Sequence, residues 1–281
     1  MTYWFAGQLH EGEQITIAAN NPALAYGASV FTTMRVYENS LKHPLTAWNW
    51  HRDRITQSLH YFDWPQPNWQ AVTRGCQAML TRFPVLRLTV LADGQPLITG
   101  RPLPTDLHQH QMEGVTTWVA QGHKYQRSLP AHKTSNYLPC WLAMQTAKTH
   151  GARDAILSTP SGEWLETSSG NLWGYKADQW WTPPLTSGIL PGISRARLID
   201  NFADQVITDI PWSLDCVKQF ECLAYSNCVV ELIPIHTVLF GNIKLNYSST
   251  HEGLSALRQM FYRPSMYDTT AEHPMQNPEM R

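Results

Sequence analysis

The sequence predicts an α+β fold divided into two subdomains. Strand-type and helix-type segments occur in blocks along the 281 residues and do not alternate as regular βα units, which favours mixed sheets. A polar stretch over residues 100–111, which contains two prolines, interrupts these blocks. We therefore expect an N-terminal α/β subdomain over residues 1–111, a second subdomain over residues 112–263, and a disordered tail over residues 264–281.

The composition is that of a folded globular chain. Hydrophobic residues make up 43% and charged residues only 15%, which excludes disorder of the whole chain. The chain has 21 Lys+Arg against 22 Asp+Glu, so no positive excess exists for binding nucleic acid or anionic lipid non-specifically. The 12 tryptophans are accordingly expected in packing and not in base stacking.

The cysteines indicate a reducing compartment. Five are present, none in a CxxC pair, so neither a disulfide framework nor a structural zinc site is expected. The first residues, Met1–Phe5, lack the basic and apolar segments of a signal peptide, and no segment predicts a membrane span. His108 and His110 alternate with glutamines, a pattern more typical of a solvated linker than of metal ligands. These features predict a cytoplasmic protein without a metal site.

In the first subdomain, β-branched, aromatic and periodic apolar residues predict the following elements. They are a strand over Val30–Tyr37, a helix over Thr46–Phe62, a helix over Val72–Phe83 and a strand over Val85–Leu91. Pro65 and Pro67 follow the first helix and exclude its continuation. The Gly100–Gln111 stretch is expected to be a connector.

In the second subdomain, a helix is expected over Pro139–His150, followed by a hairpin that turns at Pro160-Ser161-Gly162. The remaining predicted elements are strands over Asn171–Tyr175, Gln179–Thr182, Leu223–Asn227 and Pro234–Phe240, a helix over Ile193–Val206, and a last helix capped by Ser249 or Thr250.

Three local features could carry chemistry, and each has an ordinary alternative. The Gly188–Arg195 turn precedes a helix whose N-terminus could bind phosphate, although a simple Gly-Pro turn with Ser194 as N-cap is more common. Lys133 could form a Schiff base or be a solvated surface charge. Glu166 lies in a predicted strand, where it either faces solvent or has a buried cationic partner.

The order of these fragments resembles a known family. Lys133 is followed by Asn136-Tyr137, then Glu166 precedes Ser168–Leu172, and Thr182–Leu185 and Gly188–Arg195 come next; Tyr26–Val36 and Trp50–Ile55 fit the same pattern. The set resembles the fold type IV pyridoxal-phosphate enzymes, the class IV aminotransferase family, over nearly the whole chain to about Arg263. The resemblance implies a two-subdomain fold similar to D-amino-acid aminotransferases, with pyridoxal 5'-phosphate in the cleft between subdomains. The family is usually homodimeric.

The resemblance also implies site residues. Lys133 would bind the cofactor covalently, and Glu166 would pair with its pyridine nitrogen. The remaining cofactor-binding residues implied are Arg54, Tyr137, Gly192, Ile193, Ser194, Ser226 and Asn227.

The branch of the family is expected to be the 4-amino-4-deoxychorismate lyases, which make 4-aminobenzoate and pyruvate for folate biosynthesis. Phe31-Thr32-Thr33 and the spacing from Lys133 to Asn136-Tyr137 resemble these lyases, and the Arg-x-His pair of D-amino-acid aminotransferases is absent after Arg87. Lys133, Thr32 or Thr33 would move the protons, and the substrate carboxylates would bind among Arg35, Arg87 and Arg101. Ser29 and Leu91–Gly94 depart from the family pattern, and an aminotransferase acting on branched-chain or D-amino acids is the alternative.

Overall fold

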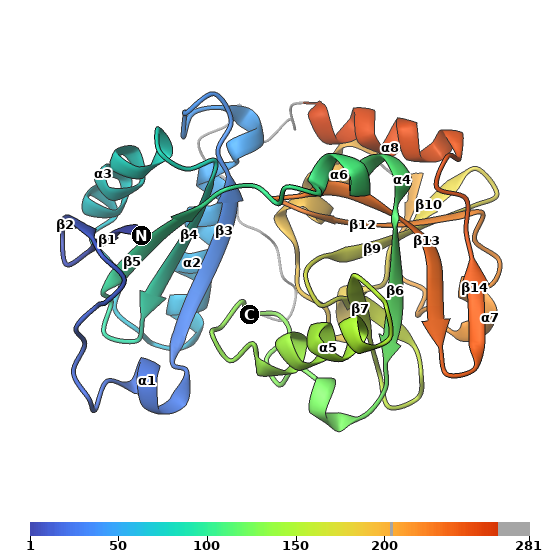
Figure 1. Ribbon diagram of the computed structural model, residues 1–281, viewed down its shortest axis with the longest axis horizontal. Helices are drawn as coiled ribbons and strands as arrows, with labels where there is room; N and C mark the ends of the chain where they lie inside the picture. Colours follow the sequence, from blue (N-terminus) through green and yellow to red (C-terminus); the bar gives the residue numbers. More distant parts are fainter. Residues whose placement is uncertain (203–204, 264–281) are drawn as a thin grey trace. The chain divides into compact units, whose positions relative to one another are not determined.

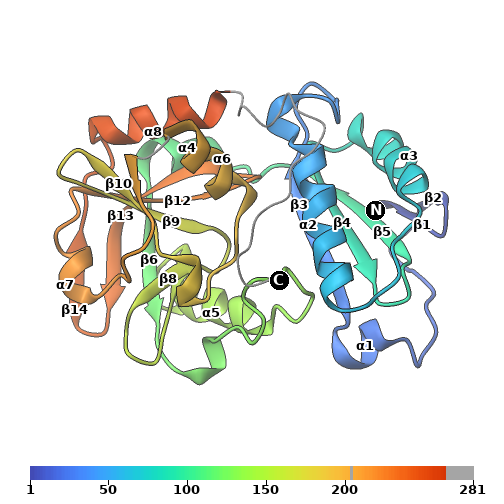
Figure 2. The ribbon, with the colours of Figure 1, turned by 180° about the vertical axis from the view of Figure 1, so that it is seen from behind.

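The computed structural model describes residues 1–202 and 205–263, which form two compact units (Figures 1 and 2). The first unit contains residues 1–104 and the segment His132–Asn136. The second contains residues 105–131 and 137–263, apart from the two undescribed residues. The expected boundary at residue 111 falls inside a helix that packs in the second unit, so the first unit ends earlier than expected. The expected tail, 264–281, lies outside the described residues.

The first unit is built on a five-stranded antiparallel sheet in the order β2-β1-β5-β4-β3. Two helices cover one face of it, as Figure 2 shows. The elements are β1 (Thr2–Phe5), β2 (Gln8–Glu11), α1 (Pro22–Tyr26), β3 (Ser29–Arg35), a 3-10 turn (Pro44–Thr46), α2 (Trp48–Tyr61), α3 (Trp69–Leu80), β4 (Val85–Leu91) and β5 (Pro96–Arg101).

The core of this unit explains why the sheet has two unlike faces. Val30 and Met34 from β3 and Leu88 from β4 pack against Ile55 and Leu59 of α2 and the apolar stripe of α3. Because side chains alternate along a strand, the residues between them point to the opposite face. That face therefore carries the odd-numbered residues of β3 and β4.

The described residues of the second unit form nine strands. Six of these make a closed barrel in the order β9-β12-β13-β6-β7-β8, closed by pairing between β8 and β9. β6 runs parallel to β7 and β13, and the other barrel pairs are antiparallel, so the expectation of mixed strands is confirmed. The strands are β6 (Val115–Ala120), β7 (Asp154–Ser158), β8 (Trp164–Thr167), β9 (Asn171–Lys176), β10 (Gln179–Trp181), β11 (Val206–Ile207), β12 (Cys222–Asn227), β13 (Glu231–Phe240) and β14 (Ile243–Asn246).

Helices pack on the outside of these strands. α5 covers β6 and β7 through a small-residue face that includes Ala143 and Ala147, while α6 and α8 contact each other and β12. The helices and 3-10 turns are α4 (Leu107–Glu113), a turn (His123–Tyr125), α5 (Leu138–Thr149), a turn (Leu185–Ser187), α6 (Ile193–Phe202), α7 (Leu214–Val217) and α8 (Glu252–Tyr262). None of the helices in the described part of the chain has the length and apolarity that crossing a membrane requires.

Most expected elements are confirmed, with three corrections. The helix expected over Ile193–Val206 ends at Phe202, and Val206 begins β11. The connector expected over Gly100–Gln111 contains the end of β5 and α4; His108 and His110 lie on this helix, so the linker interpretation is wrong. The N-cap of α8 is His251, whose Nδ1 accepts a hydrogen bond from the N–H of Gly253, and not Ser249 or Thr250. Imidazole nitrogens can cap a helix as hydroxyls do, which the residue preference alone did not reveal.

Candidate active site

Glu166 lies where the barrel of the second unit closes. It is the residue of β8 that pairs with Asn171 of β9, across the short turn formed by residues 167–170. The turn is held by Thr167, whose backbone N–H and hydroxyl both donate to the carbonyl of Gly170. The Glu166 side chain is buried, so the solvent-facing alternative is excluded.

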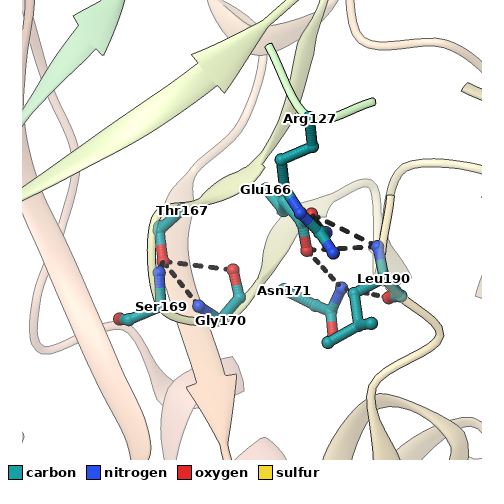
Figure 3. A network of polar contacts seen from close by, with 7 residues as sticks. All are labelled: Arg127, Glu166, Thr167, Ser169, Gly170, Asn171 and Leu190. Carbon is teal, nitrogen blue, oxygen red and sulfur yellow. Dashed lines mark hydrogen bonds and ion pairs between the residues drawn. The ribbon is translucent and has the colours of Figure 1, made fainter. Parts of the chain in front are cut away.

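The Glu166 carboxylate is surrounded by donors (Figure 3). Arg127 donates from Nη1 to Oε1 over 2.6 Å, and the backbone N–H of Leu190 lies 3.2 and 3.3 Å from the two oxygens. Asn171 donates from Nδ2 to Oε2 over 3.4 Å and to the carbonyl of Leu190 over 2.8 Å. These bonds offset the cost of burying a charge, and they tie β8, β9 and the 188–192 turn to one carboxylate.

Two arginines supply the positive charge around Glu166. Burial, the largest single influence, would lower the pKa of Arg127, but the charge of Glu166 and its hydrogen bond, together with Tyr137 and Cys140, outweigh burial and raise it. Burial lowers the pKa of Arg195 to about 10, although the charge of Glu166 opposes the decrease. Arg195 donates to the Thr182 hydroxyl and the Pro183 carbonyl over 3.2 and 3.1 Å, which fixes the loop before the 188–192 turn. Sequence reasoning assigned neither arginine a role.

The N-terminus of α6 contains Gly192, Ile193 and Ser194. The backbone N–H groups in the first turn of a helix lack intrahelical partners and carry partial positive charge, so they can bind an anion. A Cβ on Gly192 would lie 2.0 Å from Oδ1 of Asn171, so only glycine permits this close approach. The Ser194 hydroxyl lies 3.4 Å from the thiol of Cys228, a residue that the sequence analysis did not single out.

Ser226 and Asn227 end β12 and are engaged in local structure. The Ser226 hydroxyl is buried and accepts a hydrogen bond from Nε1 of Trp173 over 2.9 Å. The side-chain carbonyl of Asn227 accepts from the N–H groups of Val229 and Val230, and its amide donates to the carbonyl of Ser169. Asn227 therefore shapes the loop around Cys228, whereas Ser226 links β12 to β9.

Lys133 lies in the first unit, on a segment that extends the sheet beside β3. Thr134 forms an antiparallel bridge with Val30, the N–H of Phe31 donates to the carbonyl of Lys133, and the N–H of Ser135 donates to the carbonyl of Ser29. The neighbouring His132 is buried, 3.1 Å from the hydroxyl of Ser58 on α2. The position of Lys133 is therefore fixed by its own backbone bond to Phe31 and by the contacts of its neighbours His132 and Thr134. Its Nζ lies 4.9 Å from the ring centroid of Phe31.

Thr32 and Thr33 have different surroundings. Thr32 is fully buried on the helix-covered face, where its hydroxyl accepts a hydrogen bond from Nη2 of Arg54 and contacts Nδ1 of His51. Arg54 is itself buried on α2. This position argues against the expected catalytic contact for Thr32 and makes it a residue that orients Arg54. Thr33 points to the other face of the sheet and is partly exposed.

That other face gathers the three candidate substrate-binding arginines. We call it the arginine face and define it by Arg35, Arg87 and Arg101 with Phe31 and Thr33. Strand register places Thr33 opposite Arg87, and Val85 opposite both Arg35 and Arg101. The guanidinium carbon of Arg87 lies 3.6 Å from the Phe31 ring centroid. Burial lowers the pKa of Arg101.

Tyr137 is the residue at which the chain returns to the second unit, and it directly precedes α5. It is partly exposed, and the guanidinium carbon of Arg127 lies 5.4 Å from its ring centroid. Through Arg127 it belongs to the same group of side chains as Glu166.

A family model now shows to which family the chain belongs. The model of "Amino-transferase class IV" matches residues 29–238, which is more than half of the chain. The chain belongs to the class IV aminotransferase family. The resemblance inferred from the ordered motifs is thereby confirmed.

Curated relatives of this class IV family member are distant. It is 25% identical over 218 residues to the branched-chain-amino-acid aminotransferase of Escherichia coli K12, and the match covers 70% of this chain and 71% of the relative. The corresponding enzyme of Salmonella typhimurium is 24% identical over the same length and shares of both chains.

Solved structures confirm the expected type of fold for this family member. The branched-chain aminotransferase of Escherichia coli superposes with a TM-score of 0.77 at 21% identity, covering 96% of each chain. A hypothetical aminotransferase of Mycobacterium tuberculosis gives 0.76 at 18% identity over 93% and 98%, and it has also been solved in a PLP-bound form. A candidate 4-amino-4-deoxychorismate lyase of Legionella pneumophila gives 0.73 at 18% identity over 87% and 93%.

Proposed function

We propose that this class IV family member is a pyridoxal-phosphate enzyme with lyase activity on 4-amino-4-deoxychorismate. The donor set fits the cofactor. Lys133 offers an amine for its aldehyde, Glu166 a buried carboxylate for its pyridine nitrogen, and the glycine turn at the N-terminus of α6 a site for its phosphate. Arg54 would donate charge-assisted hydrogen bonds to the phosphate. Tyr137, whose ring lies beside Arg127, would offer its phenol to the cofactor.

When bound, pyridoxal phosphate supplies an electron sink for negative charge at the carbon that carries the substrate amine. Lys133, released by that amine, would take the proton from this carbon as a general base. Glu166 would keep the pyridine nitrogen protonated, because a nearby negative charge favours the charged form of its partner. The proton that Lys133 removed would pass through the Thr33 hydroxyl to the methylene carbon of the departing enolpyruvate, which yields pyruvate, and 4-aminobenzoate would be released.

The arginine face is the observation that carries the lyase proposal. The substrate has two carboxylates, and this face holds three arginines in the unit that also contains Lys133. The strands that contribute the face, β3, β4 and β5, contain no aspartate or glutamate. Three guanidinium groups on one face favour a substrate with two carboxylates over an amino acid with one.

The deciding experiment gives the purified protein aminodeoxychorismate with added pyridoxal phosphate and no keto acid. We expect 4-aminobenzoate and pyruvate in equal amounts. Borohydride reduction of the loaded protein, followed by peptide mapping, should place the cofactor on Lys133. A modified lysine elsewhere would contradict the assignment of Lys133, whichever reaction the protein catalyses.

An aminotransferase is the second candidate, because the curated relatives above are branched-chain aminotransferases. It would use the same Lys133 and Glu166 but need a keto-acid acceptor. Leucine or alanine with α-ketoglutarate would then give glutamate and the keto acid of the donor, and no 4-aminobenzoate would form. For either reaction we also propose a homodimer in the cytoplasm.

A further inference from the structure

We propose that His132 is a positioning residue for Lys133. By anchoring the chain to α2 directly before Lys133, it fixes the face of the sheet on which the lysine amine lies. This inference rests on the proposed function, because it concerns the lysine that would bind the cofactor. It involves only residues of the first unit.

The segment His132–Asn136 belongs to the first unit, whereas the residues on either side of it belong to the second. After Lys133, the bridge between Thr134 and Val30 joins the segment to β3. The hydroxyl of Ser135 also lies 2.6 Å from that of Ser29. These contacts hold the chain on the C-terminal side of Lys133, so its position also depends on what holds the residue before it.

His132 supplies the contact on the N-terminal side. It is only 4% exposed, its Nδ1 lies 3.1 Å from the hydroxyl of Ser58, and its ring centroid lies 4.3 and 4.9 Å from those of Tyr61 and Phe62. Ser58 and Tyr61 lie in α2, and Phe62 is its C-cap. An apolar side chain could fill the same space, but the hydrogen bond to Ser58 adds a direction that packing alone does not supply.

His132 and Lys133 lie on different faces of the sheet, because successive side chains of an extended chain point to opposite sides. His132 contacts α2, which packs on the face that contains Val30. Lys133 contacts Phe31, which belongs to the arginine face. A shift of the segment by one residue would exchange the two side chains. Burial of His132 against α2 therefore holds the amine of Lys133 on the arginine face.

Two related compounds separate the positioning of Lys133 from general damage to the site. Pyridoxal phosphate forms a covalent bond between its aldehyde carbon and Nζ of Lys133, with loss of water. Pyridoxine phosphate has the same ring and phosphate but no aldehyde. Stopped-flow absorbance of the full-length protein, freed of cofactor, would give the rate of bond formation, and borohydride trapping with peptide mapping would identify the lysine. Titration of tryptophan fluorescence would give the dissociation constant of pyridoxine phosphate.

The variants distinguish the two kinds of contact that His132 makes. His132→Phe keeps an aromatic ring against α2 but loses the bond to Ser58, and Ser58→Ala removes the partner of that bond. His132→Asn keeps a polar group near the position of Nδ1. His60→Ala is the matched control, because His60 is an exposed histidine in the last turn of the same helix.

We expect His132→Phe and Ser58→Ala each to slow bond formation at Lys133 about tenfold or more, since a small displacement of a reacting group lowers its rate steeply. The double variant should be no slower than either single variant, because both lose the same bond. His132→Asn should react faster than His132→Phe. The dissociation constant of pyridoxine phosphate should change less than about twofold in every variant, because its ring and phosphate would bind elsewhere. His60→Ala should match the wild type in both measurements.

The inference is overturned if Ser58→Ala or a folded His132→Phe forms the bond as fast as the wild type. It is also overturned if these variants weaken the binding of pyridoxine phosphate by the same factor as they slow bond formation, since the whole site would then be damaged. Ser58→Ala alone decides the question if His132→Phe does not fold. Failure of the proposed lyase function would look different: the wild type would form no 4-aminobenzoate, while bond formation at Lys133 would still depend on His132.

Discussion

Arg127 and Glu166 form a buried ion pair, with 2.6 Å between Nη1 and Oε1 and side chains that are 7% and 6% exposed. Arg127 comes from the loop before α5, whereas Glu166 is in the strand that closes the barrel. The pair therefore connects the closure of the barrel to the chain that leads toward Lys133. The carboxylate that we propose to face the pyridine nitrogen is therefore already paired with the guanidinium of Arg127.

Replacing Arg127 by methionine should destabilise the protein. The change leaves the buried Glu166 carboxylate without its cation, and such losses cost about 3–5 kcal/mol. Urea unfolding of wild type and variant would measure the difference. The double variant Arg127→Met with Glu166→Gln should recover part of it, because the uncompensated charge is gone. A single-variant cost below about 1 kcal/mol, as for an exposed pair, would mean that the two groups are not coupled in solution.

Replacing Glu166 by glutamine should reduce turnover by at least about 100-fold, since the charge that favours a protonated pyridine nitrogen is removed. The cofactor should still bind, because Lys133 and the N-terminus of α6 are unchanged. Steady-state kinetics and the absorbance of the loaded protein would separate these effects. Glu163→Gln, in the same hairpin, is the control and should keep full activity. Equal turnover in the two variants would mean that a residue other than Glu166 pairs with the pyridine nitrogen.

Asp154 predicts a specific pH dependence of stability. Burial raises its pKa above the ordinary value of 3.8, even though hydrogen bonds from Ser168, Ser169 and the N–H of Ala155 oppose the increase. The folded state thus holds this proton more tightly than the unfolded state. The stabilisation is fully present below a pH of about 4 and is lost as the pH rises through the raised pKa.

Urea unfolding of wild type and Asp154→Asn at several pH values would test this. Asparagine does not titrate, so the free energy of unfolding of the wild type, minus that of the variant, should fall as the pH rises and then level off. An increase in this difference over the same range would show that the folded state lowers the pKa of Asp154.

The cysteines predict a pattern of alkylation. Burial raises the pKa of Cys76 and Cys222 to about 12, so both thiols should resist iodoacetamide at a pH of about 8 in the folded protein. Cys216 and Cys228 are partly exposed and should react, Cys216 the more slowly because burial raises its pKa. Because Cys228 contacts Ser194 at the proposed phosphate site, pyridoxal phosphate should slow its labelling and leave that of Cys216 unchanged. Peptide mass spectrometry would read both sites; equal effects on the two would argue against phosphate binding there.

The sequence by itself determined the family, most helices and strands, and the residues singled out as Lys133, Glu166 and Gly192. These depend on local information: apolar periodicity follows the geometry of each element, and the order of short motifs is preserved along one chain. Elements without a clear period, such as β1, β5 and α4, escaped that analysis because their stability comes from neighbouring strands and helices.

Only the tertiary structure decided how these residues meet. Two adjacent threonines are equivalent in sequence, but packing of α2 on one sheet face buries Thr32 against Arg54 and leaves Thr33 on the arginine face. Arg127 carried no sequence signal, because its partner Glu166 is 39 positions away along the chain. Closure of the barrel and the addition of the Lys133 segment beside β3 likewise join distant segments. Local patterns set the direction of each side chain, whereas long-range packing sets which side chains lie in contact.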